Sequence, residues 1–168
     1  MKNTDYKKWR QDDPKYNQTV AWPESEYPDA KLHTFAECGC LVTALAIMLR
    51  KHNRIPKDEI QEFNPRTFCD RLKKFGVFDS AGNLCSFLPI EYLYKIKYVG
   101  SQDYSYEALK TDASDGMVLL KVKGNNAPFH FICLDKLTSN DAVIIDSASD
   151  KSHLSEFDEV YEILKFIK

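Results

Sequence analysis

The chain has 168 residues, of which 43% are hydrophobic and 29% are charged, and its formal net charge is −2. This size and composition are typical of one globular domain that buries its own core, so we expect a single domain over residues 1–168. Charges of both signs are interspersed and form no basic stripe, which argues against a nucleic-acid partner.

The N-terminal sequence and the apolar runs argue against a signal peptide and a membrane span. MKNTDYKKWRQDDPKYNQ contains no apolar stretch of the kind that a signal peptide requires. The longest apolar run, residues 40–49, is too short to cross a bilayer. We therefore expect a soluble protein, cytoplasmic by default, with no membrane partner; a phage-associated protein or one exported by another route stays open.

The first half of the chain predicts helices after a loop-rich start. Residues 1–36 show little periodicity, and we expect an extended, loop-rich N-terminal arm there. Apolar residues recur at helical spacing over residues 40–52. Pro56 near the first turn favours a short helix over residues 55–63, and an early proline with Gly76 as a stop signal favours another over residues 64–76.

The second half of the chain predicts strands. We expect them over the segments rich in apolar and β-branched residues, which are 94–100, 116–124, 130–138 and 141–149. Tight connections between the last three predict an antiparallel meander. A helix is expected over residues 105–113, while residues 159–167 fit a strand or a helix. Helices followed by an antiparallel sheet indicate an α+β domain.

The segment AECGCLVTALAIML, residues 36–49, is compatible with a metal clip, a redox pair or a single nucleophile. Zinc sites and redox pairs use cysteines at wider spacings than C-x-C, and the five cysteines form no disulfide framework, so we expect reduced thiols and no metal. Cys40 stands where a helix begins, and unpaired N–H groups there favour a thiolate. A small buried hydrophobic residue is the alternative for Cys40.

A cysteine nucleophile needs a histidine to hold its proton and a further group to orient that histidine. His130 opens a predicted strand directly after a tight turn. Asp146 ends the run AVIID of the next predicted strand, at the matching end of an antiparallel neighbour, which predicts cross-strand proximity to His130. Cys40, His130 and Asp146 together are the candidate catalytic residues, although His130 alone is compatible with a strand-end histidine that has no role.

Four short motifs resemble one known family. GCLVTALAIML is similar to the nucleophile helix of papain-like cysteine peptidases related to the bacteriocin (double-glycine) leader peptidases, in their stand-alone branch, whose members read roughly G-C-x-x-T-x-L-A-M. This register selects Cys40 and not Cys38. QDDPKY (residues 11–16), HFICLD (residues 130–135) and IIDSA (residues 144–148) resemble the family's Q-x-D-P-x-W, H-F and I-x-D-P-A motifs in the expected order.

The sequence departs from these motifs at three positions. Tyr16 stands for tryptophan, Ser147 for proline, and Lys136 for the glycine that follows the histidine motif. The resemblance implies a papain-like α+β fold with the nucleophile helix packed on an antiparallel sheet. It also implies a cysteine peptidase or amide hydrolase that acts by thiolate acyl transfer.

In the implied mechanism, Cys40 attacks, His130 protonates the leaving amine and Asp146 holds the imidazole. Gln11 donates to the oxyanion together with the Cys40 backbone N–H, and Gln18 is a second glutamine for that role. The substrate is then a peptide, and no metal or organic cofactor is implied. Two alternatives stay open: a phage-type lytic enzyme that cleaves peptidoglycan stem peptides with the same triad, and a non-catalytic papain-like binding module.

Overall fold

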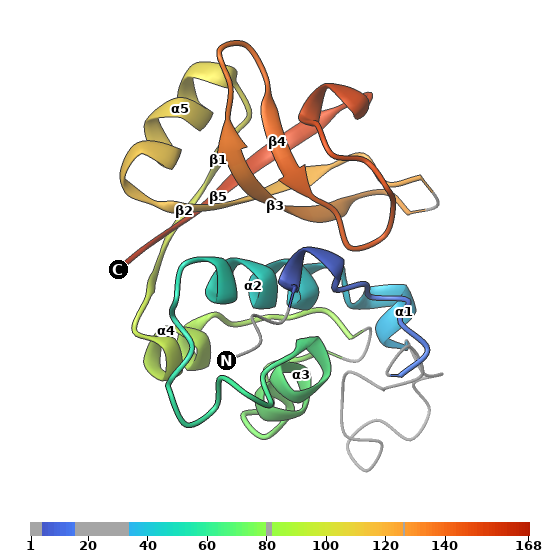
Figure 1. The fold of residues 1–168 in the computed structure, drawn as a ribbon, viewed down its shortest axis with the longest axis vertical. Helices are drawn as coiled ribbons and strands as arrows, with labels where there is room; N and C mark the ends of the chain where they lie inside the picture. The colour runs from blue at the N-terminus through green and yellow to red at the C-terminus, as the bar shows by residue number, and fades with distance from the viewer. Residues whose placement is uncertain (1–4, 16–33, 80–81, 126) are drawn as a thin grey trace.

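A computed structural model of the protein describes residues 5–15, 34–79, 82–125 and 127–168 (Figure 1). Its centre is a five-stranded antiparallel sheet in the order β1-β5-β2-β3-β4. The strands are β1 (Lys97–Asp103), β2 (Met117–Val122), β3 (His130–Leu137), β4 (Ala142–Ile145) and β5 (Val160–Ile167). Helices and one antiparallel sheet confirm the α+β class.

The predicted meander is confirmed, because β2 pairs with β3 and β3 pairs with β4, all antiparallel. Residues 159–167, which fit a strand or a helix, form β5. This strand lies between β1 and β2 and pairs with both, so the last element of the chain is an interior strand of the sheet. The strand predicted over residues 94–100 begins later, at Lys97, and extends to Asp103.

The helices are η1 (Tyr6–Lys8), α1 (Phe35–Cys38), α2 (Cys40–Lys51), α3 (Pro65–Lys73), α4 (Leu88–Tyr94), α5 (Tyr106–Asp115) and η2 (Leu154–Glu156). The helices predicted over residues 40–52, 64–76 and 105–113 are confirmed as α2, α3 and α5. Asn64 caps α3 by accepting from the N–H groups of Arg66 and Thr67 at 3.0 and 3.1 Å, directly before Pro65.

The helix predicted over residues 55–63 is wrong. The segment forms successive turns, with N–H groups of Glu59 and Phe63 donating to the carbonyls of Pro56 and Glu59. Ile55 and Phe63 are buried at its two ends. So short a helix is marginal without a continuous buried face, and the segment instead leads into the cap of α3.

The sheet is covered on both faces. On one face, Met117 and Leu119 of β2 join a core cluster with α2, α3 and α4; on the other, Val118, Leu120 and Val122 pack with α5 and η2. Figure 1 shows this arrangement, with α2, α3 and α4 below the sheet and α5 above it. Alternate residues of a central strand therefore enter two different cores.

The N-terminal segment crosses α2. After η1, Trp9 is buried against Phe63 with ring centroids 6.1 Å apart, so residues 5–15 are anchored and are less extended than predicted. Residues 1–4 and 16–33 of the predicted arm lie outside the described residues, and at its end the loop prediction is wrong, because Thr34 caps α1 and residues 35–36 are its first two residues. In the part of the chain that the structure describes, no helix is long and apolar enough to cross a membrane.

Candidate active site

Cys40 is the first residue of α2 and follows a break in the helical hydrogen bonding. The last helical hydrogen bond before the break is donated by the Gly39 N–H to the Phe35 carbonyl at 2.8 Å. The first one after it is donated by the Thr43 N–H to the Gly39 carbonyl, also at 2.8 Å. Between them, the N–H groups of residues 40–42 donate to no backbone carbonyl among the described residues. Such a helix start presents unpaired N–H groups and the positive end of the helix dipole beside the Cys40 side chain.

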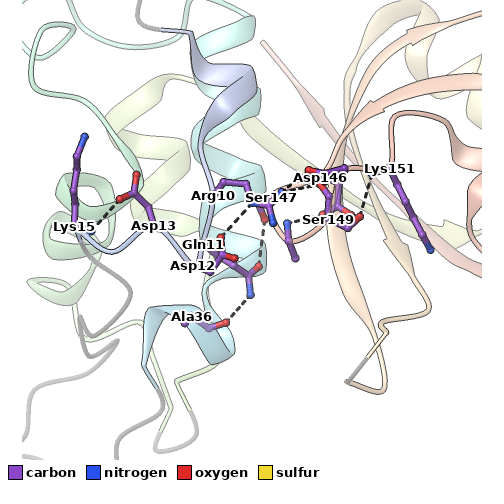
Figure 2. A network of polar contacts seen from close by, with 12 residues as sticks. Arg10, Gln11, Asp12, Asp13, Lys15, Ala36, Asp146, Ser147, Ser149 and Lys151 are labelled. Carbon is purple, nitrogen blue, oxygen red and sulfur yellow. Dashed lines mark hydrogen bonds and ion pairs between the residues drawn. The ribbon is translucent and has the colours of Figure 1, made fainter.

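Gln11 occupies this break from the N-terminal segment. Its Nε2 donates at 2.7 Å to the carbonyl of Ala36, the acceptor that the Cys40 N–H would use in an uninterrupted α-helix. Its Oε1 accepts from the Ser147 hydroxyl at 3.3 Å, and its backbone N–H donates to the Ser147 carbonyl at 3.1 Å (Figure 2). Gln11 is 8% exposed and Ser147 1%, so both are held inside the protein.

His130 and Asp146 lie together at the ends of neighbouring strands, since His130 opens β3 and Asp146 directly follows β4. His130 Nε2 lies 2.6 Å from Asp146 Oδ1. Because this contact uses Nε2, the nitrogen left for another partner is Nδ1. The Cys40 side chain also interacts with this imidazole, both through a hydrogen bond and through its charge. The three side chains therefore meet at the end of the sheet, where α2 begins.

The surroundings of His130 favour its protonated form. Burial alone lowers the pKa of the imidazole, but the hydrogen bonds to Asp146 and Cys40 and the charges of both groups outweigh burial and raise the pKa to about 9. An imidazole that is favoured as a cation and is hydrogen-bonded to a cysteine side chain at a helix start is the partner that a cysteine nucleophile requires.

Three donors hold the Asp146 carboxylate. His130 and the Ala148 N–H contact Oδ1 at 2.6 and 2.8 Å, and the Ser149 hydroxyl donates to Oδ2 at 2.5 Å. Burial raises the pKa of this carboxyl, but the hydrogen bond and charge of His130, with the bonds from Ser149 and Ala148, leave it lowered. Asp146 is therefore an anion that is only 7% exposed and has three hydrogen bonds.

A cavity of about 390 Å³ opens beside these residues. Gln11, His130 and Asp146 line it, together with small residues of α1 and of the loops around β3 and β4, namely Ala36, Gly124, Ala127 and Ala148. Glu37 and Lys123 add one charge of each sign. Cys40 is half-buried and is outside this lining. A ligand in the cavity therefore contacts the groups that surround the thiol.

The other cysteines have different environments. Burial raises the pKa of Cys38, Cys69 and Cys133 to about 12, which keeps these thiols neutral, while Cys85 is exposed. Among the described residues, no group of three or more His, Cys, Asp or Glu side chains is arranged to hold a metal ion.

Sequence reasoning brought Cys40, His130, Asp146 and Gln11 forward, and the structure brings these four together. Gln18, the other glutamine considered, lies outside the described residues. Ser149, Ala148 and the Ala36 carbonyl were missed as neighbours of the site. The hydroxyl-rich turn after a strand-ending aspartate, DSAS at residues 146–149, is the signal that points to Ser149.

Comparisons with protein-family models, with curated proteins and with solved structures found no match. The structure itself has an α+β fold in which a cysteine at a helix start, a histidine and an aspartate meet beside a cavity.

Proposed function

We propose that this protein is a papain-like cysteine peptidase, an amide hydrolase with Cys40 as its nucleophile. One observation carries the proposal: His130 is bound to Asp146 through Nε2 at 2.6 Å and interacts with the Cys40 side chain. A nucleophile, a base and a group that orients the base are the parts that thiolate acyl transfer requires. The order of elements, a nucleophile helix followed by an antiparallel sheet that carries the other two residues, supports a papain-like arrangement.

The proposed reaction begins with the Cys40 thiolate beside the His130 imidazolium. The sulfur attacks the amide carbonyl carbon and forms a tetrahedral oxyanion, which collapses as His130 gives its proton to the leaving amine. Neutral His130 then takes a proton from water, and the hydroxide equivalent attacks the thioester carbonyl. The carboxylic acid product leaves, and the thiolate–imidazolium pair is restored. Asp146 stays ionised and holds the imidazole throughout.

Gln11 supplies two parts of the proposed oxyanion site. By donating to the Ala36 carbonyl it ties the N-terminal segment to the helix break, where the Cys40 N–H has no backbone acceptor among the described residues and is available to the oxyanion. An amide NH₂ has two donors, so a second N–H of Gln11 is present beside the one that binds Ala36. Two such donors aimed at the developing negative charge are the usual form of an oxyanion hole.

The activity-independent test is thiol labelling followed by peptide mapping. A brief exposure to iodoacetamide at about pH 6 should label Cys40 far faster than the other four cysteines, because only Cys40 has an imidazolium partner at a helix start. Cys85 is the matched control, since it is exposed and lies away from any histidine partner among the described contacts. Labelling of Cys85 ahead of Cys40 would contradict the proposal.

The activity test compares peptide mixtures and purified peptidoglycan as substrates. Cys40→Ala and His130→Ala should each reduce turnover by about 1,000-fold or more, and the double variant should be little worse than either, since both residues act in the same transition state. Cys85→Ala should keep wild-type turnover. Wild-type activity in Cys40→Ala would refute the proposal that this protein is a cysteine peptidase. The substrate that is cleaved separates a protein peptidase from a lytic enzyme acting on stem peptides.

A further inference from the structure

The turn after β4 is tied together by Ser149. Its hydroxyl donates to Asp146 Oδ2 at 2.5 Å and accepts from the Lys151 N–H at 3.2 Å. Its carbonyl accepts from Arg10 Nη1 at 3.0 Å, which links the turn to the N-terminal segment that carries Gln11 (Figure 2). The bond from the Lys151 N–H thus orients the Ser149 hydroxyl, whose only proton is donated to the Asp146 carboxylate.

The two oxygens of Asp146 have different tasks. Oδ1 receives both His130 Nε2 and the Ala148 N–H, while Oδ2 receives the Ser149 hydroxyl, its one hydrogen-bond donor among the described residues. A carboxylate held at one oxygen alone can still rotate about its terminal bond, where the torsional preference is broad. A donor on the second oxygen fixes that rotation.

We propose that Ser149 is a positioning residue for the reaction: its hydroxyl holds the Asp146 carboxylate in the rotation that presents Oδ1 to His130. The proposal rests on the proposed function of Cys40 and His130, and Ser149 acts on the substrate only through Asp146 and His130.

The charged groups around Asp146 come from several elements. His130 of β3 faces it directly, and through His130 it is coupled to Cys40 of α2. Arg10, in the N-terminal segment, interacts electrostatically with the Asp146 carboxylate. A second hollow of about 500 Å³ borders Asp146 on another side, and its charged lining residues are Lys7, Lys8, Arg10, Asp135, Asp150 and Lys151. The substitutions at Ser149 and Ser155 leave all of these groups unchanged.

The chain contains a matched control for this hydrogen bond. The Ser155 hydroxyl donates to Asp141 Oδ2 at 2.6 Å, nearly the same contact as that between Ser149 and Asp146. Asp141 lies on the turn between β3 and β4, where its Oδ1 accepts from the Ser155 N–H at 3.2 Å. Ser155→Ala therefore removes a similar serine–aspartate bond at a place with no thiol or catalytic histidine.

The experiment measures pH–rate profiles of wild type, Ser149→Thr, Ser149→Val and Ser155→Ala. Threonine and valine have the same shape, so these two variants differ only in the hydroxyl, and any packing effect is common to both. Ser149→Val should lower kcat by about tenfold with KM within about twofold, and Ser149→Thr should restore most of kcat. The profile of Ser149→Val should also narrow. Its acid limb should shift to higher pH because Asp146 is protonated more easily. Its alkaline limb should shift to lower pH because His130 loses its proton more easily.

A second readout needs no turnover. The imidazole C–H resonances titrate with pH in NMR spectra, and His130→Gln identifies the His130 signal among the four histidines. The His130 midpoint should fall in Ser149→Val and stay near its wild-type value in Ser149→Thr and Ser155→Ala. An unchanged midpoint in Ser149→Val, or an equal change in Ser155→Ala, would overturn the proposal. A shifted midpoint in a protein that cleaves no amide would support the role of Ser149 while refuting the proposed peptidase function.

Discussion

Two buried aspartates of this molecule, Asp146 and Asp112, have similar burial but different partners. Asp146 is 7% exposed and Asp112 6%, and each is bound by a polar side chain from a neighbouring strand. Asp112, on α5, accepts from Gln102 Nε2 at 2.5 Å and pairs with Lys165 Nζ at 3.3 Å. Its partners keep the same charge at all moderate pH values, whereas the partner of Asp146 is a histidine.

This difference separates a structural ion pair from a candidate catalytic one. Asp112 joins α5 to β1 and β5, and Lys165 has a second acceptor in Asp115 at 2.7 Å, so this network holds elements together with some redundancy. Asp146 instead reaches a thiol through His130, beside a cavity. Burial and pairing of a carboxylate are thus not by themselves signs of catalysis; a titratable partner next to a nucleophile is.

The largest expected effect is a comparison of Asp146→Asn with Asp112→Asn. An amide at residue 146 keeps the shape but removes the charge that stabilises the His130 imidazolium, so we expect kcat to fall by roughly 100- to 10,000-fold. Asp112→Asn should keep kcat within about twofold, since residue 112 touches no group of the site. Steady-state kinetics measure both, and circular dichroism checks that both variants fold. A large loss of kcat in Asp112→Asn would remove the distinction between the two networks.

The second comparison uses the two glutamines that serve these regions. Gln11→Ala should reduce kcat by about 100-fold or more, because it removes one proposed oxyanion donor and the contact that holds the N-terminal segment at the helix break. Gln102→Ala, which removes the donor to Asp112, should cost about 1 kcal/mol of unfolding free energy and leave kcat unchanged. Equal kcat values for Gln11→Ala and wild type would exclude Gln11 from the oxyanion site.

The smallest effect concerns the pH dependence of stability. The pKa of His130 is about 9 in the folded protein against an ordinary value of 6.5, so the folded state binds this proton more tightly. The resulting stabilisation is complete below about pH 6.5, declines between about 6.5 and 9, and is lost above that range. Urea unfolding of wild type and His130→Gln should therefore show a difference in free energy that shrinks as pH rises through this window.

The control for this measurement is Asp112→Asn. Its partner Lys165 keeps its charge across the same window, so the difference from wild type should stay nearly constant with pH. A wild-type stability that does not decline relative to His130→Gln above pH 6.5 would contradict the raised pKa of His130. The paired curves thus separate a titrating pair from a permanently charged one.

Local patterns in the sequence carry much of this fold and the positions of the candidate residues. Helical spacing of apolar residues from Cys40 predicts a buried helix, and β2, β3 and β4 follow from apolar runs separated by tight turns. His130 at a strand start and Asp146 after the adjacent strand are placed near each other by antiparallel pairing alone. Periodicity does not resolve residues 159–167, because only pairing with β1 and β2 selects the strand.

What the sequence by itself determined is therefore the class of the fold, the helix that begins at Cys40 and the meander that brings His130 beside Asp146, since each depends on neighbours within one or two elements. Only the tertiary structure decided the rest of the site. Gln11 reaches Ala36 and Ser147, which are 25 and 136 residues away in the chain, and the Asp146 rotation depends on Ser149 and the packed turn around it. Contacts of that range depend on how the N-terminal segment crosses α2 and meets the end of the sheet, which no local pattern of residues records.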